Sequence, residues 1–340
     1  MQIHTNISLK NFTTMRLGGP ARFFAEVRSK EEVQTLYKNA KAKNIPIFVI
    51  GSGSNLIARD EGYPGLIMKI RMMGFEIIDE DEYSKTIKVG AGEDWDEVVK
   101  KTVDMQLSGV ETMSGIPGTA GATPVQNVGA YGQEIADTLV SLEAYDVETD
   151  SFVELTNEQC EFSYRHSIFR GRYQGRYIIT SITIRLRKLL PAPPFYEGLQ
   201  NYLDKNNITI YTHQSIRDAV LAVRKNKLPP IDEKPSAGSF FKNAIVEDWK
   251  FNEVSSKFPD MPSFNMPDGS RKVPTGWLID QAGLKGKLIN GIRVHEGNTL
   301  VLVNESAQSY NDLATAREEI SGVVRDKFQI IIEQEPLEII

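Results

Sequence analysis

The most informative run in the sequence is Gly115-Ile116-Pro117-Gly118-Thr119-Ala120-Gly121-Ala122-Thr123-Pro124-Val125-Gln126-Asn127-Val128-Gly129-Ala130-Tyr131-Gly132. Five glycines and two prolines in eighteen residues preclude a long helix or a central strand. The run also carries no charged side chain, which is unusual for a solvated loop. Uncharged, glycine-dense backbone with Thr, Gln and Asn donors favours wrapping around a large planar or polyphosphate ligand. The alternative is a buried structural loop, which would need many partners for its backbone.

A shorter glycine-rich turn, Gly51-Ser52-Gly53-Ser54-Asn55, directly follows the apolar strand expected at residues 45–50. Successive backbone N–H groups in such a turn form a concavity that accepts phosphate oxygens. A hairpin turn is the alternative. The sequence lacks the Gly-Lys-Ser/Thr of a Walker A loop, and no G-x-G-x-x-G opens a helix as in a Rossmann fold. The turn is therefore a candidate phosphate cradle of another type.

Length and composition set the class of protein. With 340 residues, we expect two or three domains. Hydrophobic residues make up 41%, which is enough for a folded core, and the net charge of -6 argues against general nucleic-acid binding. The single Cys160 precludes an internal disulfide, and the four histidines lack metal-ligand spacing. We see no signal peptide and no apolar run of the ~20 residues that span a bilayer. We expect a cytoplasmic protein with no metal and no membrane association.

The pattern of helices and strands predicts an α+β protein with mixed sheets. We expect helices at 30–40, 94–107, 215–226, 275–282 and 309–328, and strands that include 139–147, 152–155, 177–186 and 330–332. These elements group into segments 1–70, 71–213 and 214–340. The last segment break falls between Pro194 and Lys227.

Two further stretches carry candidate chemistry. Arg165 lies among aromatic and apolar residues in Phe162–Phe169, where an arginine is costly unless paired, so it is a candidate anion clamp. A surface arginine is the alternative. Ser239 lies among small residues ahead of Lys242. No G-x-S-x-G elbow surrounds it, so a proton-donor role is favoured over a nucleophile, and a loop serine without a catalytic role is the alternative.

Together these stretches closely resemble the MurB family of UDP-N-acetylenolpyruvoylglucosamine reductases, in its longer-loop class. The matching motifs are GSGSN, IPGTAGATPVQNVGAYG, FSYRHSIF, KLPP, AGSFFKN, GWLIDQAGLKG and, more weakly, the tail around Glu333 to Glu335. The resemblance implies an FAD-binding region of the vanillyl-alcohol-oxidase (PCMH) type. That region would comprise two α/β subdomains, 1–70 and 71–213. An α+β substrate-binding domain, 214–340, would follow, with a last strand near 329–335 returning to the active site.

The resemblance also implies the site residues. The FAD-binding set is Gly51, Ser52, Gly53, Ser54, Asn55, Pro117, Gly118, Gly121, Ala122, Pro124, Gln126, Asn127, Gly129, Ala130, Tyr131 and Ile179. The substrate-binding set is Tyr196, Arg224, Lys227, Asn243, Phe264 and Asn298. Arg165, Ser239 and Glu335 match the catalytic positions.

The implied reaction reduces UDP-N-acetylglucosamine enolpyruvate to UDP-N-acetylmuramate for peptidoglycan synthesis, with NADPH as hydride donor and FAD as carrier. Arg165 would stabilise the negative charge that hydride addition creates, Ser239 would supply a proton, and Glu335 would orient the substrate carboxylate. A monomer is expected. The alternatives are an alcohol-oxidase-type flavoenzyme on the same scaffold and a non-catalytic module that binds a nucleotide sugar.

Three positions depart from the family pattern. Phe264 stands where the family has a tyrosine, and Asn298 stands where it has a glutamine. The family tail continues Glu-Val-Arg, whereas Glu335 is followed here by Pro336 and Leu337. Glu333 is therefore a second candidate for the catalytic carboxylate.

Overall fold

The chain divides into two compact units in this computed structural model, which describes residues 1–231 and 233–340. The first unit comprises Met1–Ile7, Ala21–Gly53 and Pro64–Asn226, and the second comprises Ser8–Pro20, Ser54–Tyr63 and Lys227–Ile340. The main break follows Asn226, whereas the predicted segments meet at residues 213 and 214. Two short N-terminal pieces nevertheless belong to the second unit, because Met15, Leu17 and Ile57 are buried in its core.

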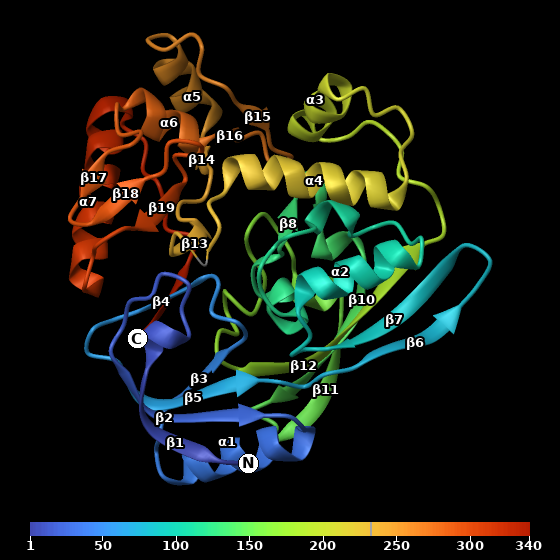
Figure 1. Ribbon diagram of the computed structural model, residues 1–340. Helices are drawn as coiled ribbons and strands as arrows, with labels where there is room; N and C mark the ends of the chain where they lie inside the picture. The colour runs from blue at the N-terminus through green and yellow to red at the C-terminus, as the bar shows by residue number, and fades with distance from the viewer. Residues whose placement is uncertain (232) are drawn as a thin grey trace. The chain divides into compact units, whose positions relative to one another are not determined.

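A four-stranded sheet and a helix form the first part of the first unit (Figure 1). The sheet has the order β1 (Ile3–Ser8), β2 (Pro20–Val27), β5 (Tyr63–Ile70), β3 (Ile47–Ile50), with β3 and β5 parallel. The helix α1 (Lys30–Ala42) begins as predicted, because the Ser29 side chain accepts a hydrogen bond from the Glu32 N–H at 3.2 Å. Its apolar face is buried through Val33, Leu36 and Ala40.

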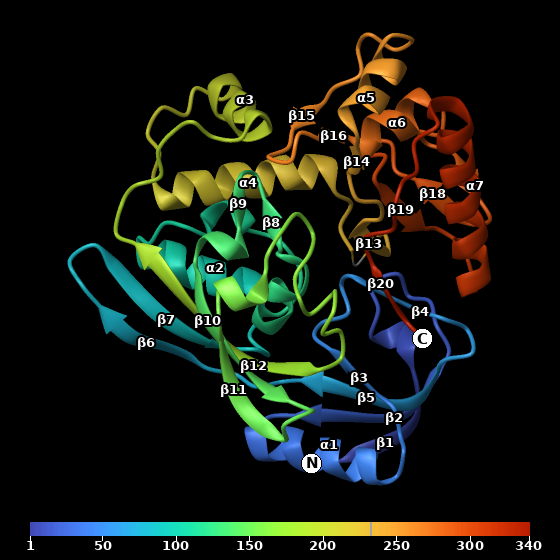
Figure 2. The ribbon, with the colours of Figure 1, turned by 180° about the vertical axis from the view of Figure 1, so that it is seen from behind.

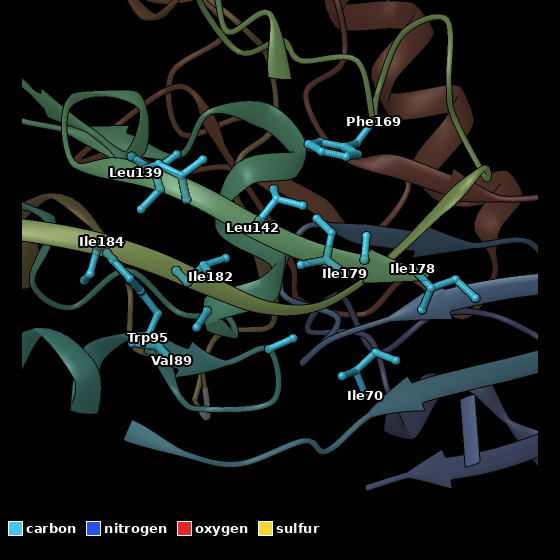
Figure 3. Close-up of a cluster of buried hydrophobic side chains, with 14 of the residues drawn as sticks. Ile70, Val89, Trp95, Leu139, Leu142, Phe169, Ile178, Ile179, Ile182 and Ile184 are labelled. Carbon is cyan, nitrogen blue, oxygen red and sulfur yellow. The ribbon is translucent and has the colours of Figure 1, made fainter. Parts of the chain in front are cut away.

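A five-stranded antiparallel sheet forms the second part of the first unit. Its order is β11 (Ser151–Thr156), β10 (Leu139–Asp146), β12 (Tyr177–Arg187), β7 (Ser84–Gly90), β6 (Phe75–Glu80), so the predicted strands at 139–147, 152–155 and 177–186 are confirmed. Isoleucines of β12 pack with Val89 and with Trp95 of α2 (Trp95–Asp104) (Figure 3). This buried layer is joined to the glycine-rich run, because the backbone N–H of Trp95 donates to the Gly118 carbonyl at 3.1 Å.

Shorter elements complete the first unit. The glycine-rich run holds a 3₁₀ helix (Ala120–Gln126) and the small hairpin β8 (Gly129–Ala130) and β9 (Gln133–Glu134). Figures 1 and 2 both show α3 (Glu197–Lys205) beside α4 (His213–Lys227), and Leu199 and Leu203 pack against Ile216 and Val220. The helix predicted at 215–226 is confirmed as α4, and it groups with the first unit rather than with segment 214–340.

The second unit packs helices on small antiparallel sheets. One sheet has the order β13 (Ser236–Ser239), β19 (Val301–Asn304), β18 (Ile292–Val294), β17 (Leu288–Ile289); another has the order β14 (Ala244–Val246), β16 (Arg271–Val273), β15 (Phe264–Asn265). The helices are α5 (Asp248–Ser255), α6 (Thr275–Gln281) and α7 (Tyr310–Phe328). In both views α7 lies beside β18 (Figures 1 and 2). The predicted helix at 309–328 is confirmed, and Ser309 and Asp312 form its capping box.

The last strand differs from the prediction. Strand β20 covers Leu337–Ile339 and pairs in parallel with β4 (Leu56–Ala58), whereas within 329–335 only Gln334 forms a bridge, with Phe241. Ile330 and Ile332 are buried and Ile331 is 77% exposed, so this run has the alternation of a strand. Residues 330–332 form no ladder, because backbone pairing with the neighbouring segment begins only at Glu333, whose carbonyl accepts from the Lys242 N–H.

Candidate functional site

The Gly51–Asn55 turn connects β3 to β4. Gly53 has a φ of +78°, a left-handed conformation that glycine adopts without strain. A Cβ on Gly51 would lie 2.4 Å from the Thr119 hydroxyl, so this turn is packed against the glycine-rich run. Ser52 is exposed, and Ser54 and Asn55 are half-buried. The turn thus presents backbone and small polar groups, as a phosphate cradle requires.

The middle of the glycine-rich run packs closely against Ala91, the residue that follows β7. A Cβ on Gly121 would come within 2.4 Å of the Ala91 Cβ and 2.9 Å of its Cα, and Gly121 N–H donates to the Ala91 carbonyl at 3.0 Å. Pro117 is exposed and Gly118 half-buried. The remaining half-buried members of the predicted FAD set here are Gly121, Ala122, Gln126, Gly129, Ala130 and Tyr131.

This surface fits a flavin nucleotide by its chemistry. Uncharged backbone that stays half-buried, rather than entering the core, leaves apolar and amide groups for a large planar ligand. Part of the run is structural: Asn127 is fully buried, accepts from the Ala136 N–H at 3.1 Å and donates to the Ser163 carbonyl at 3.3 Å. Pro124 is also buried, and Ile179 is a core residue of β12 paired with Ala144.

Arg165 contacts the glycine-rich run directly. Its Nη2 donates to the Gly129 carbonyl at 3.2 Å, and its guanidinium carbon lies 5.3 Å from the Tyr164 ring centroid. The residue has a φ of +54°, inside a tight turn that a bridge between Ser163 and His166 closes. The geometry places a permanent cation beside the predicted cofactor surface, as an anion clamp requires.

A second cationic group lies at the start of the run. Arg224 of α4 donates from Nη2 to the Gly115 carbonyl at 2.9 Å, and burial lowers the pKa of this guanidinium. Arg217, seven residues earlier on the same helix, forms a bidentate pair with Asp96 at 2.6 and 2.9 Å. Asp96 also accepts from the Gly115 N–H at 2.6 Å. Both polar groups of Gly115 are therefore held by charged side chains.

The sequence did not reveal Asp96 or Arg217. The available indication was an arginine among Ile216, Val220 and the other buried residues of α4, since a buried arginine requires a partner. Nearby, Tyr131 and Tyr196 make an edge-to-face contact with ring centroids 6.0 Å apart. Tyr196 remains 47% exposed, and burial raises the pKa of Tyr131.

In the second unit, Ser239 and Glu335 lie on neighbouring segments. Ser239 ends β13 opposite Val301 and follows Gly238, whose φ is +70°. The Glu335 N–H donates to the carbonyl of Phe240 at 2.8 Å, so Glu335 is paired with the residue next to Ser239.

The two candidate carboxylates differ in surroundings. Glu335 is only 9% exposed, whereas the Glu333 side chain is 71% exposed and forms an ion pair with Lys242 at 3.3 Å. Glu335 therefore has the more enclosed position of the two.

The remaining predicted substrate residues are spread over the second unit and the end of α4. Asn243 accepts from the Thr275 N–H at 3.2 Å, and Asn298 accepts from the Leu300 N–H at 3.1 Å. Phe264 is 43% exposed, and its ring lies 5.5 Å from the Lys272 ammonium. Lys227 is exposed.

Residues 1–231 and 233–340 contain no group of three or more His, Cys, Asp or Glu side chains arranged to hold a metal ion. None of the helices in this part of the chain combines the length and hydropathy needed to cross a bilayer.

Comparison with known proteins gives two family matches. Residues 21–156 match the model of an FAD binding domain, and residues 229–339 match the C-terminal domain of UDP-N-acetylenolpyruvoylglucosamine reductase. The predicted fold class, an FAD-binding region followed by a C-terminal α+β domain specific to the family, is confirmed.

Relatives of full length carry the same description. The chain is 40% identical over 336 residues to UDP-N-acetylenolpyruvoylglucosamine reductase of Flavobacterium johnsoniae, covering 98% of this chain and 99% of the relative. It is 36% identical to that of Neisseria meningitidis, covering 98% and 96%. The crystal structure of the Thermus caldophilus reductase shares its fold, with a TM-score of 0.65 at 24% identity over 99% of this chain and 98% of the other.

Proposed function

The chain belongs to the UDP-N-acetylenolpyruvoylglucosamine reductase family, and from that membership we propose a full reaction for it. It is a flavin-dependent oxidoreductase of peptidoglycan synthesis. In the proposal, NADPH supplies the hydride and UDP-N-acetylglucosamine enolpyruvate accepts it, giving UDP-N-acetylmuramate. We further propose that the protein acts as a cytoplasmic monomer without nucleic-acid or membrane partners.

The observation that carries the proposal is the contact between Arg165 and the glycine-rich run, through the 3.2 Å bond to Gly129. It joins a fixed cation to the uncharged surface that fits the cofactor. When bound there, FAD supplies hydride transfer between the nicotinamide donor and the vinyl carbon of the substrate.

The protein residues handle the charge that this transfer leaves behind. Hydride addition creates negative charge on the carbon beside the substrate carboxylate, and Arg165 binds that carboxylate and stabilises the charge. Ser239 then donates its hydroxyl proton to this carbon. Glu335 orients the carboxylate end of the substrate. Its burial, compared with the exposed and ion-paired Glu333, supports this choice.

Other residues bind the remainder of the substrate in this proposal. Arg224 and Lys227 supply positive charge for the diphosphate, and Tyr196 and Asn243 add polar contacts. Phe264 lacks the hydroxyl that the resemblance leads one to expect. In this proposal, the neighbouring Lys272 ammonium makes a charged contact with the substrate from the same sheet.

One anaerobic experiment tests cofactor, donor and acceptor together. The visible spectrum is recorded after incubation with FAD, then after NADPH, then after the enolpyruvyl sugar nucleotide. We expect a yellow protein, loss of its colour with NADPH, and return of the colour with the sugar nucleotide. A protein that stays colourless with excess FAD would contradict the proposal. Rapid oxygen consumption with an alcohol, without bleaching by NADPH, would favour an alcohol oxidase instead.

A further inference from the structure

The segment around Glu335 is held by backbone and side-chain hydrogen bonds of the residues that precede and follow it. Gln334 forms a backbone bridge with Phe241, and its Nε2 donates to the Pro336 carbonyl at 2.8 Å. Leu337 then starts β20, and its N–H donates to the Asn55 carbonyl at 3.1 Å. The chain therefore changes pairing partner within three residues, at the position of Glu335.

One acidic residue of β20 gathers three donors. Glu338 accepts from Arg59 Nη2 at 2.9 Å, from the Tyr310 hydroxyl at 2.9 Å and from Arg317 Nη1 at 2.8 Å. The Glu338 side chain is 16% exposed and that of Arg317 is 25% exposed. Bonds between ionised groups with this degree of burial are strong and directional.

Arg317 donates hydrogen bonds to residues on both sides of Glu335. In addition to Glu338, its Nη1 donates to Gln334 Oε1 at 2.9 Å. Gln334 immediately precedes Glu335, and Glu338 follows three residues later, so one guanidinium from α7 spans the segment that carries Glu335. Pro336 and Leu337, which directly follow Glu335, are uncharged and cannot form such a bridge themselves.

We propose that Arg317 is a positioning residue for the reaction, which fixes Glu335 by bridging Gln334 and Glu338. This inference rests on the proposed role of Glu335. A misplacement of about 1 Å in a group that orients substrate costs on the order of a hundredfold in rate. Loss of the bridge should therefore slow the substrate step while leaving the donor step intact.

The test uses Arg317→Met in the FAD-loaded protein, with anaerobic stopped-flow of each half-reaction. We expect flavin reoxidation by the enolpyruvyl sugar nucleotide to slow about tenfold to a hundredfold, and reduction by NADPH to change less than about twofold. Independently of turnover, amide hydrogen exchange at Glu335 and Leu337 should become faster. The matched control is Arg293→Met, because Arg293 pairs with Glu305 at 2.5 Å and is 32% exposed in the same unit. It should change neither half-reaction nor the two amides.

Unchanged reoxidation in Arg317→Met, or an equal loss in both half-reactions, would overturn the inference. Glu335→Gln separates the two proposals. If it leaves reoxidation normal, the assigned role of Glu335 fails. If it slows reoxidation while Arg317→Met does not, only the positioning role fails. Should Arg317→Met not fold, Glu338→Gln removes the charge of the same bridge with little change of shape, and the same outcomes decide.

Discussion

Asp96 and Arg217 form a bidentate ion pair, with oxygen–nitrogen distances of 2.6 and 2.9 Å, between the start of α2 and the face of α4. Arg217 is 8% exposed and Asp96 is 31% exposed. The same carboxylate binds the Gly115 N–H, so the pair also fixes the beginning of the glycine-rich run.

The first prediction concerns Asp96→Asn. Burial alone would raise the pKa of Asp96, but the bonds from Arg217 and Gly115 and the charge of Arg224 outweigh it, and the pKa is lowered. The carboxylate therefore stabilises the fold above its unfolded pKa, and this contribution is lost as pH falls through the lower folded value. We expect Asp96→Asn to cost about 2–3 kcal/mol at pH 7, and the difference from wild type to shrink below about pH 4.

Denaturant unfolding at several pH values measures this difference. Asp280→Asn is a suitable control, since Asp280 pairs with Lys285 at 3.5 Å and both side chains are nearly half exposed. That pair should contribute less than about 1 kcal/mol. A difference for Asp96→Asn that does not vary with pH would contradict the prediction.

The second prediction concerns close backbone packing. Gly121→Ala would force its Cβ into the Ala91 side chain and backbone, at 2.4 and 2.9 Å, so we expect a loss of about 1–3 kcal/mol and weaker FAD retention. Gly322 of α7 has no atom closer than 4.0 Å to such a Cβ, so Gly322→Ala should stabilise by about 0.5–1 kcal/mol. Thermal unfolding and bound-flavin absorbance measure both. Equal effects at the two glycines would refute the packing argument.

The third prediction concerns Ser239→Ala. If its hydroxyl supplies the proton, reoxidation of reduced flavin by the sugar nucleotide should slow by about a hundredfold or more, while reduction by NADPH is retained. Stopped-flow absorbance of the two half-reactions measures this. Ser236→Ala, three residues earlier on β13, is the control and should leave both rates close to wild type. A parallel loss of both half-reactions in Ser239→Ala would count against the assignment.

The fourth prediction concerns Arg165→Lys. Lysine keeps the charge but replaces a planar fork with a single ammonium, so it cannot bind a carboxylate in two places. We expect the substrate half-reaction to stay at least about tenfold slower than wild type despite the retained charge. Steady-state kinetics with varied sugar nucleotide provide the measurement. Near-normal kcat/KM would rule out the clamp.

Local sequence patterns predicted most of the secondary structure, because caps and periodicity act over a few residues. Helices α1 and α7 begin close to the predicted positions, and the structure shows Ser29 and Ser309 as their N-caps. The assignment of Met15 and Leu17 to the second unit was not predictable, since their apolar character does not specify which core they enter.

The same distinction applies to the candidate site. Glycine density and missing charge led to the predicted cofactor surface, because both are properties of one continuous run. The Asp96–Arg217 pair joins residues 121 positions apart, and the three donors on Glu338 come from separate elements. Such pairings depend on the tertiary fold, which composition and spacing do not encode.

The pairing of β20 with β4 has a consequence for biosynthesis. Ile57 and Ala58 are made early, yet their strand partner, Leu337–Ile339, leaves the ribosome hundreds of residues later. Until Leu337–Ile339 has been made, the hydrogen-bonding edge of β4 lacks this partner, and strand pairs between segments so far apart in sequence form slowly.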